Sequence, residues 1–541
     1  MAESIREQKI GSTLSNAFLS QWLVWWLWVN SVGRLPGGLG WVPTLLFDIL
    51  SVGFWVFHFS VQKRVKAKNV AKTAVDWVKK RDWIVLGPVG IALLTAVFYA
   101  GILEPIDWDG LDYHLPAILQ AVQFKQWGRL EDPYYAVQGF PKLVESLYLF
   151  WILHFKSHEY LLLGLIPLFL GAAGFWELSR HFRVSTRWVM ILWFTTPIVI
   201  KQASSLYIDH FVAAFGILAC AALVRREQRS FALALAFFVG SKLSAGVPAV
   251  VLVASWVIRY REIPFWVGFY GSATLGVTLL SNFFVFGNPL YPFTFAPFGL
   301  RIFPGLFKPS EFVAGVPWAS DPIYLRWIRA FFELEFPARW DMLRGAIGVL
   351  QGAVVWVGLG TVLAGGLRGK LSLRKAVGIL FIPELFLAFL LSSGHWVLRY
   401  NLWVLAVFYL WAAALLGALP IKAQRWLGIL FVIQAVTLTG DLSWMLGNRE
   451  KVLAAYRTEN YAEIIDIIGK RWTELWHWGE PQDASNPVDL ERIRVRKTHG
   501  KVYTLCPNPR PQQLAAYYGR DFTNLVYFDP AACLEPRSLG E

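Results

Sequence analysis

The chain has 541 residues, of which 56% are hydrophobic and 16% are charged, and it contains 28 tryptophans. Soluble domains average about 25% charged residues, so this composition excludes an ordinary soluble protein and indicates a membrane protein. The formal net charge of +14 does not indicate a nucleic-acid partner, because the basic residues fall in short clusters between apolar runs. The polar N-terminus lacks the features of a cleavable signal peptide.

Apolar runs of about 20 residues predict membrane-spanning helices. The predicted spans are 18–34, 41–60, 83–103, 159–178, 187–204, 209–225, 264–284, 343–364, 376–393, 401–418 and 424–442. Two shorter runs, 230–241 and 244–259, are separated by the stretch "GSKLSAG". Together these runs predict about 13 membrane segments. The run "PKLVESLYLFWILHF" (141–155) is interpreted instead as a helix at the outer surface, because counting it as a span would place a basic cluster outside.

Basic clusters fix the predicted orientation, since cytoplasmic loops carry an excess of lysine and arginine. The clusters occur at 63–81, 180–187, 225–229, 259–261, 368–375 and 422–425. Consecutive clusters are separated by two apolar runs, so the runs pair as hairpins. We therefore expect a multi-pass protein of the inner or plasma membrane, with a cytoplasmic N-terminus and an extracytoplasmic C-terminus.

This topology predicts an all-α polytopic fold in three parts. Residues 1–82 form an N-terminal helical hairpin and a basic cytoplasmic loop, and residues 83–442 form the main transmembrane domain with outer loops 104–158 and 285–342. Residues 443–541 read as a small extracytoplasmic α/β domain, because "KVYTLC" and "NLVYF" have the pattern of short strands. Its Cys506 and Cys533 either form a disulfide or remain free thiols.

The first outer loop crowds four carboxylates into "EPIDWDGLDYHLP", residues 104–116, although acidic residues are scarce in this chain. From Tyr113 onward the apolar spacing becomes that of a helix lying along a membrane surface. Asp112 suits the N-cap of that helix. Asp109, between Trp108 and Gly110, has less need to be acidic for folding, and a carboxylate there suits a general base.

An ordered set of motifs follows this loop. "WDGLDYHLP" is followed by "WGRL" and "FPKLVESLYLF", then by "SSLYIDHFVAAF", "FVGSKLSAG", "FGNPLYPF" and "LRYNLWVLAVFYLWAAAL". The set resembles the bacterial polytopic glycosyltransferases of the C superfamily (GT-C), including the glycosyltransferase 39-like enzymes related to protein mannosyltransferases and to the lipid A aminoarabinose transferase. It covers roughly residues 83 to 442. The hairpin over 18–60 is additional to that pattern.

The resemblance implies a membrane glycosyltransferase that moves a sugar from a polyprenyl-phosphate donor to a glycan, lipid or protein acceptor at the outer face. It implies an acidic general base in the first outer loop, for which Asp109 is the main candidate, with Asp112 and His114 as further catalytic candidates. Asp107 and Glu145 are additional active-site candidates. A single displacement would invert the anomeric configuration.

Three residues at the outer ends of predicted spans complete the candidate site. Arg399 suits bidentate binding of the donor phosphate, or anchors a span at the interface. Lys242 lies in a broken hairpin, where it either holds a phosphate or extends towards the interface. Asp209 opens a span, where an ionisable residue is either functional or an N-cap. No cluster of ligands predicts a structural metal. The alternative that a divalent cation, Mg or Mn, bridges the phosphate and the acidic loop stays open.

Two alternatives belong to other classes of protein. A polytopic transporter or lipid flippase also has about a dozen spans with broken helices and buried charges, but it concentrates its ionisable residues near the bilayer midplane. A scaffold subunit without catalytic activity would tolerate substitution of the acidic loop. The gathering of candidates near the outer ends of the spans favours chemistry at the membrane surface.

Overall fold

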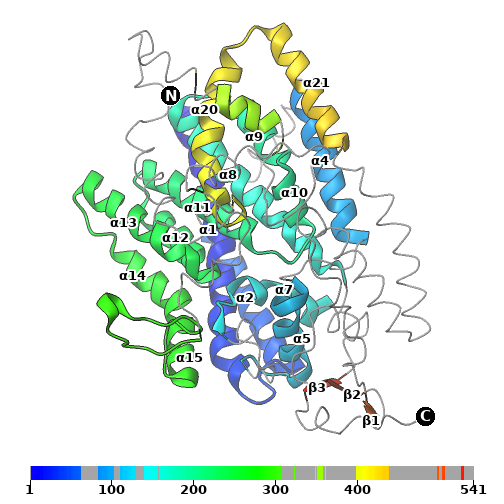
Figure 1. The fold of residues 1–541 in the computed structure, drawn as a ribbon, viewed down its shortest axis with the longest axis vertical. Coiled ribbons are helices and arrows are strands. Elements are labelled where there is room, and N and C mark those ends of the chain that lie inside the picture. Colours follow the sequence, from blue (N-terminus) through cyan, green and yellow to red (C-terminus); the bar gives the residue numbers. More distant parts are fainter. Residues whose placement is uncertain are drawn as a thin grey trace.

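The structure is a computed structural model. It describes residues 2–61, 83–102, 110–128, 139–155, 158–306, 322, 348, 350–357, 360, 398–437, 496–498, 502–505 and 525–528. This part of the chain is almost entirely helical (Figure 1). Its main helices are α1 (Ala2–Ser31), α2 (Trp41–Val61), α4 (Trp83–Ile102), α5 (Leu115–Phe124), α7 (Leu143–Phe155), α8 (Leu165–Phe182), α9 (Thr186–Phe194), α10 (Pro197–Ala203), α11 (Asp209–Val224), α12 (Gln228–Ser241), α13 (Gly246–Tyr260), α14 (Phe265–Gly271), α15 (Val277–Phe286), α20 (Leu405–Ala418) and α21 (Ile421–Thr437).

Four helical stretches of the described residues are long and apolar enough to cross a membrane. They are Glu159–Phe182, Leu243–Tyr260, Phe265–Phe286 and Arg399–Ala418. Large apolar side chains are exposed along α13, α14 and α15, among them Val250, Phe265 and Phe284. Such surfaces suit contact with lipid. The chain is therefore a helical membrane protein, and the predicted number of about 13 segments stays a prediction, because 376–393 and most of 343–364 lie outside the described residues.

Two predicted segments differ in detail from the observed helices. The single run predicted over 187–204 is divided into α9 and α10, because Pro197 lacks a backbone N–H donor and starts a new helix after Thr195 and Thr196. Helix α7 has 13 residues, too few for the roughly 20 that cross a bilayer. Its length agrees with the interpretation of this run as a helix that does not span.

Basic loops that are far apart in the sequence meet at one end of the bundle. Arg225, after α11, forms an ion pair of 2.6 Å with Glu177 of α8. Arg226 pairs with Glu262, which follows α13. The amide of Asn16 in α1 donates to the Ser230 hydroxyl in α12 at 2.8 Å. These contacts bring together the loops that the charge pattern assigned to one side, and we name this the basic end.

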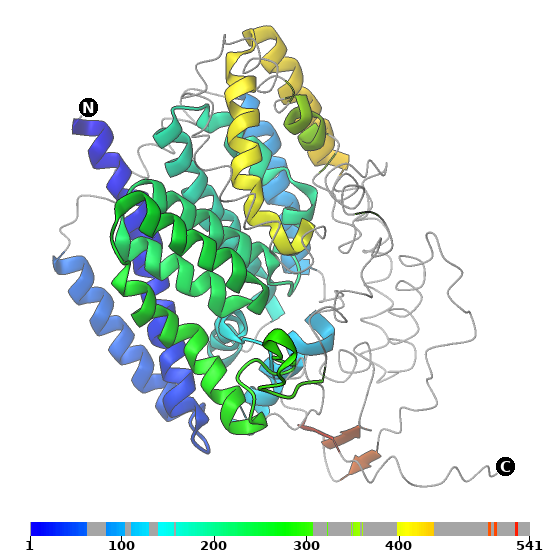
Figure 2. The ribbon, with the colours of Figure 1, turned by 60° about the vertical axis from the view of Figure 1, so that its left-hand side comes forward.

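Helix α1 runs from the basic end to the opposite end of the bundle (Figure 2). There the chain after α1 hydrogen-bonds to the chain after α5, through Trp127 N and Gly33 O at 2.7 Å. The Asn282 amide of α15 donates to the Gly139 carbonyl at 2.9 Å. Three segments that are separated in the sequence by about a hundred residues or more thus meet at this opposite end.

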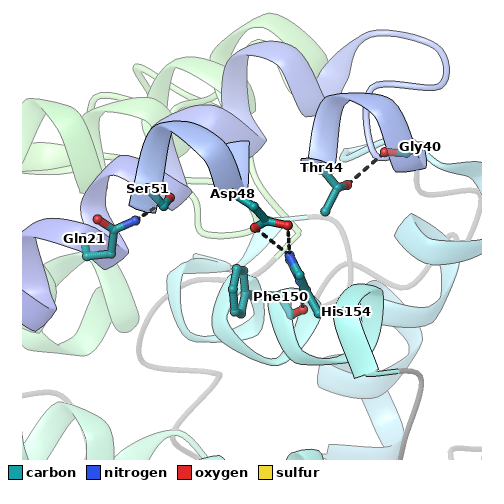
Figure 3. A network of polar contacts seen from close by, with 7 residues as sticks. All are labelled: Gln21, Gly40, Thr44, Asp48, Ser51, Phe150 and His154. Atoms are coloured by element: carbon teal, nitrogen blue, oxygen red, sulfur yellow. Dashed lines mark hydrogen bonds and ion pairs between the residues drawn. The ribbon is translucent and has the colours of Figure 1, made fainter. Parts of the chain in front are cut away.

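The N-terminal hairpin packs into the bundle through polar contacts with α7 (Figure 3). The hairpin closes on itself where the Gln21 amide of α1 donates to the Ser51 hydroxyl of α2 at 2.7 Å. In α2, Asp48 accepts from His154 Nε2 of α7 at 2.9 Å, and the other ring nitrogen of His154 lies 2.6 Å from the Phe150 carbonyl. The hairpin that the sequence marked as additional is therefore attached to the helix that follows the acidic loop.

Near the C-terminus the structure describes three short strands in the order β1–β2–β3. They are β1 (Arg496–Thr498), β2 (Val502–Leu505) and β3 (Leu525–Phe528). β1 pairs antiparallel with β2, and β2 pairs parallel with β3. Strands β2 and β3 fall in the two stretches that the sequence marked as strands. The domain boundaries, the rest of the α/β domain and the pairing of Cys506 with Cys533 lie outside the described residues.

Candidate functional site

Three predicted site residues, Asp209, Lys242 and Arg399, converge on one point. Asp209 is the first residue of α11, Lys242 follows the last residue of α12, and Arg399 lies in the 3-10 helix Leu398–Val404 that leads into α20. Helix α11 has 16 residues, so its start lies roughly 24 Å from the basic end, to which its last turn belongs. The cluster therefore lies well away from the basic loops.

The carboxylate of Asp209 faces two cations. Its Oδ1 forms an ion pair with Lys242 Nζ, and its Oδ2 lies 3.7 Å from Arg399 Nε. Asp209 is 2% exposed and Arg399 is 4% exposed, while the side chain of Lys242 is 20% exposed. Because the N-cap of α11 is Ile208, with Asp209 one position later, Asp209 serves to pair these cations and not to cap the helix.

Two tyrosines frame the cations. The Arg399 guanidinium lies over the Tyr207 ring at 4.8 Å and over the Tyr400 ring at 4.7 Å, and its Nη2 donates to the Tyr400 hydroxyl at 2.8 Å. Lys242 Nζ lies 4.0 Å from the centre of the same Tyr400 ring. Cation–π contacts hold a positive group without neutralising its charge. We name Tyr207, Asp209, Lys242, Arg399 and Tyr400 the cationic cluster.

Within the described residues, the cationic cluster contains two cations and one carboxylate, so these side chains together carry a net positive charge. The side chain of Lys242 is partly exposed, so the cluster is partly open to the surface. A site in which cations outnumber carboxylates favours an anionic ligand. Arginine offers a planar fork of donors to phosphate and lysine offers a point charge, and together they suit a phosphate group.

A second cluster forms around the start of α7. His114 Nδ1 lies 2.8 Å from Glu145 Oε1, and Lys142 Nζ lies 3.9 Å from the same oxygen. His114 and Glu145 are 2% and 1% exposed, so this contact is shielded from water. Among the described residues, His114 Nε2 and Glu145 Oε2 have no hydrogen-bond partner. A buried imidazole held at one nitrogen by a carboxylate, with its other nitrogen available, is suited to exchange a proton with a ligand.

Both clusters lie at the same end of the bundle. Gly240, two residues before Lys242, has room for no side chain, because a Cβ atom there would lie 2.8 Å from Thr274 Cβ and 3.0 Å from Leu143 Cδ2. The end of α12 therefore packs closely against the start of α7. The Tyr148 ring of α7 also contacts the Phe211 ring of α11 edge-on.

The acidic loop itself is described only in part. Asp107 and Asp109 lie outside the described residues, so the assignment of a general base stays a prediction. The backbone from Gly110 to His114 forms a π-helical turn, and α5 begins at Leu115 with His114 at its N-cap position. Asp112 therefore lies inside the π-helical turn, two residues before the observed N-cap residue His114, and not at the N-cap position where the sequence interpretation placed it. The cause is that helical structure starts earlier, at Gly110.

Sequence reasoning missed Tyr207, Tyr400 and Lys142 as parts of these clusters. Tyr207 precedes Asp209 by two positions and Tyr400 directly follows Arg399. An aromatic residue beside an ionisable one at the end of a predicted span is a usable signal, but tyrosine is also common at membrane interfaces. Lys142 is three positions before Glu145, the spacing that brings side chains together on a helix.

No metal-binding group emerges within the part of the chain that the structure describes. There, no three His, Cys, Asp or Glu side chains are placed to hold an ion. Glu104, Asp107 and Asp109 fall outside that part, so the alternative of a divalent cation between the acidic loop and a phosphate stays open.

Comparison with known proteins gives one structural likeness. No protein-family model matches the chain, and no curated protein matches it. Among solved structures, the chain is similar to ArnT from Cupriavidus metallidurans bound to undecaprenyl phosphate, with 14% sequence identity and a TM-score of 0.42. The match covers 82% of this chain and 75% of that one.

Proposed function

We propose that this protein is a membrane glycosyltransferase that takes its sugar from a polyprenyl-phosphate donor and works at the outer face of the membrane. The observation that carries the proposal is the cationic cluster, in which Asp209, Lys242 and Arg399 meet at the end of the bundle away from the basic loops. The ordered motifs from the acidic loop to "LRYNLW" agree with this function.

In the proposed mechanism the lipid-linked donor enters from the bilayer and its phosphate contacts Lys242 and Arg399. Asp209 orients both cations, because each of its oxygens faces one of them. Lys242 has three N–H donors and Arg399 has five, and in this mechanism some of these donors bind the phosphate oxygens. The positive charge of the cluster stabilises the negative charge that develops on the leaving phosphate.

The chemical step is a displacement at the anomeric carbon. Asp109 accepts a proton from the nucleophile of a glycan, lipid or protein acceptor, and that nucleophile forms the new bond to the anomeric carbon. The bond from this carbon to the phosphate oxygen breaks, and the lipid phosphate leaves with the electron pair. Since one displacement occurs, the anomeric configuration is inverted. His114 belongs to the stretch 104–116 that contains the acidic residues, and the His114–Glu145 pair is available to assist proton transfer.

Binding of undecaprenyl phosphate to the purified full-length protein tests the phosphate assignment. We expect Arg399→Gln and Lys242→Gln to weaken binding by about tenfold or more, because a charge-assisted hydrogen bond contributes roughly 1.5–3 kcal/mol. Arg425→Gln and Lys422→Gln remove the same charges from exposed positions at the basic end and are the matched controls. Equal binding by all four variants would contradict the proposal.

Transfer of sugar tests the assignment of the base. In membranes that supply the lipid-linked donor, Asp109→Asn should abolish transfer while undecaprenyl phosphate still binds. A variant that folds, binds the lipid and still transfers the sugar would remove Asp109 from the mechanism. Movement of the lipid across the membrane by the wild type, without a glycosylated product, would indicate the flippase alternative.

A further inference from the structure

A cavity with positively charged residues in its wall lies apart from the cationic cluster. It has a volume of ≈ 100 Å³ and is lined by the end of α1, the segment after α5 and the end of α15. Arg34 and Lys142 both line it, and its wall contains no carboxylate among the described residues. None of the residues of the cationic cluster lines this cavity. It is therefore a separate site, and Arg34 comes from the additional N-terminal hairpin.

Hydrogen bonds position the Arg34 guanidinium and use only some of its N–H donors. Its Nη2 donates to Asn30 Oδ1 at 3.1 Å and to the Ser281 hydroxyl at 3.2 Å. Across the described residues, Arg34 makes no ion pair and its Nη1 and Nε make no hydrogen bond. Two neutral partners thus orient the guanidinium without neutralising it, which leaves a positioned cation at the wall of a cavity.

The backbone is shaped to admit the guanidinium. Gly128 has a φ of 78°, in the left-handed region that favours glycine, and a Cβ atom there would lie 3.0 Å from Arg34 Nη1. A hydrogen bond holds the two segments together, because Gln126 Nε2, two residues before Gly128, donates to the Arg34 carbonyl at 2.7 Å. A side chain at position 128 would push the guanidinium away from its place beside the cavity.

Lys142 supplies the second cation. Its Nζ donates to the Phe140 carbonyl at 3.1 Å and lies 5.9 Å from the centre of the Tyr113 ring. The Lys142 residue is 8% exposed, and burial lowers its pKa to about 8, although Glu145 opposes this shift. Lys142 therefore remains mostly protonated at neutral pH, so it presents a positive charge at the wall of the cavity.

The position of the cavity indicates where the anion comes from. The stretch Phe265–Phe286 is long and apolar enough to cross a membrane, and its last residues, Val285 and Phe286, form part of the cavity wall. Phe284 and Val285 are also exposed. The end of a spanning helix lies at the level of the lipid head groups, where Arg and Lys attract anionic lipids.

We infer that this cavity binds a phosphate group through Arg34 and Lys142, at a site separate from the cationic cluster. A phospholipid head group beside α15 and free inorganic phosphate are two sources of the same chemistry. Arg34 belongs to the hairpin and Lys142 to the segment before α7, so a phosphate held by both would join the hairpin to the helix that follows the acidic loop.

The test measures binding of phosphatidylglycerol to the full-length protein in detergent, by native mass spectrometry, with inorganic phosphate as a second probe. We expect Arg34→Gln to weaken binding of phosphatidylglycerol by about tenfold or more. Arg34→Lys, which keeps the charge and loses the fork, should give a smaller loss. Arg301→Gln removes an exposed arginine shortly after α15 and should change binding by less than about twofold.

Each outcome has a distinct meaning. Arg34-dependent binding of phosphatidylglycerol identifies a lipid as the source, and Arg34-dependent binding of inorganic phosphate alone identifies a soluble ligand. If Arg34→Gln binds both probes as the wild type does, while its melting temperature shows that it is folded, the inference is wrong. If Arg34→Gln does not fold, Arg34→Lys decides in the same way. Because Arg399→Gln should leave this binding unchanged, a failure here is separable from a failure of the proposed donor site.

Discussion

At the scale of single residues, Asp209 determines the charge of the cationic cluster. It faces both Lys242 and Arg399 and is almost fully buried. Asp209→Asn should therefore remove the carboxylate that faces the buried Arg399 and the partly exposed Lys242, and we expect a loss of stability of roughly 3–5 kcal/mol. Thermal unfolding in detergent measures this loss. Undecaprenyl phosphate should stabilise Asp209→Asn more than the wild type, because its phosphate replaces the missing negative charge; equal stabilisation would contradict a phosphate position between these cations.

Lys142 makes stability depend on pH through its lowered pKa of about 8 in the folded protein. Below this value the folded and unfolded states are both protonated, and the full cost of burying the ammonium is present. Between about 8 and the ordinary value of 10.5 the unfolded state binds more protons, so stability rises with pH. The groups near Lys142 that the described residues supply include Glu145, the Phe140 carbonyl and the Tyr113 ring, and Arg34 lines the same cavity.

The corresponding variant is Lys142→Met, which keeps the apolar stem and removes the charge. We expect Lys142→Met to be more stable than the wild type at pH 7, and this difference to shrink by an amount on the order of 3 kcal/mol towards pH 10.5. Denaturant unfolding of both proteins at several pH values measures the difference. A difference that stays constant over this range would show that Lys142 is not buried as a cation.

At the scale of helices, the sequence predicted the elements better than their contacts. Apolar runs located most helices of the described part because a spanning helix must be apolar over a fixed length. The ends of these runs also marked Asp209, Lys242 and Arg399 as unusual residues, since a charge there is costly. That these three residues meet was not predictable from one sequence, because they are separated by 33 and 157 positions and their contact depends on how α11, α12 and α20 pack.

Local chemistry explains the other differences. The break between α9 and α10 was readable from Pro197, whereas the π-helical turn at Gly110–His114 has no comparable sequence signal. Arg34 was absent from the predicted site because its hairpin lies outside the motifs that resemble GT-C enzymes. Its role depends on Ser281 and Gly128, which are distant in the sequence and carry no charge.

The hairpin is expected to depend on the contact between Asp48 and His154 shown in Figure 3. Asp48→Asn and His154→Gln should each lower the free energy of unfolding by about 1 kcal/mol, because each removes one partner of a partly buried hydrogen bond. A double-mutant cycle measures their coupling, and the two losses should not add. Thr44→Ala removes a hydrogen bond to the carbonyl of Gly40, the residue before α2, and is the control. Additive effects of Asp48→Asn and His154→Gln would show that the contact does not hold the hairpin.

At the scale of the whole molecule, the two ends of the bundle differ in chemistry. The basic end is tied together by ion pairs between arginine and glutamate, including the pair between Arg225 and Glu177. The opposite end holds the cationic cluster, the His114–Glu145 pair and the cavity beside Arg34. Under the positive-inside rule this difference predicts that the basic end faces the cytoplasm and that both candidate anion sites face outward.

Labelling of single cysteines tests this orientation. Leu35 lies just after α1 at the end away from the basic loops, and Ile263 lies between α13 and α14 at the basic end; both are strongly exposed. In a background in which Cys220, Cys506 and Cys533 are replaced by serine, a membrane-impermeant maleimide added to intact cells should label Leu35→Cys and spare Ile263→Cys. After permeabilisation both should react, which controls for accessibility. If only Ile263→Cys were labelled in intact cells, the orientation would be the reverse of the predicted one. Both proposed phosphate sites would then face the cytoplasm, away from a donor in the outer leaflet.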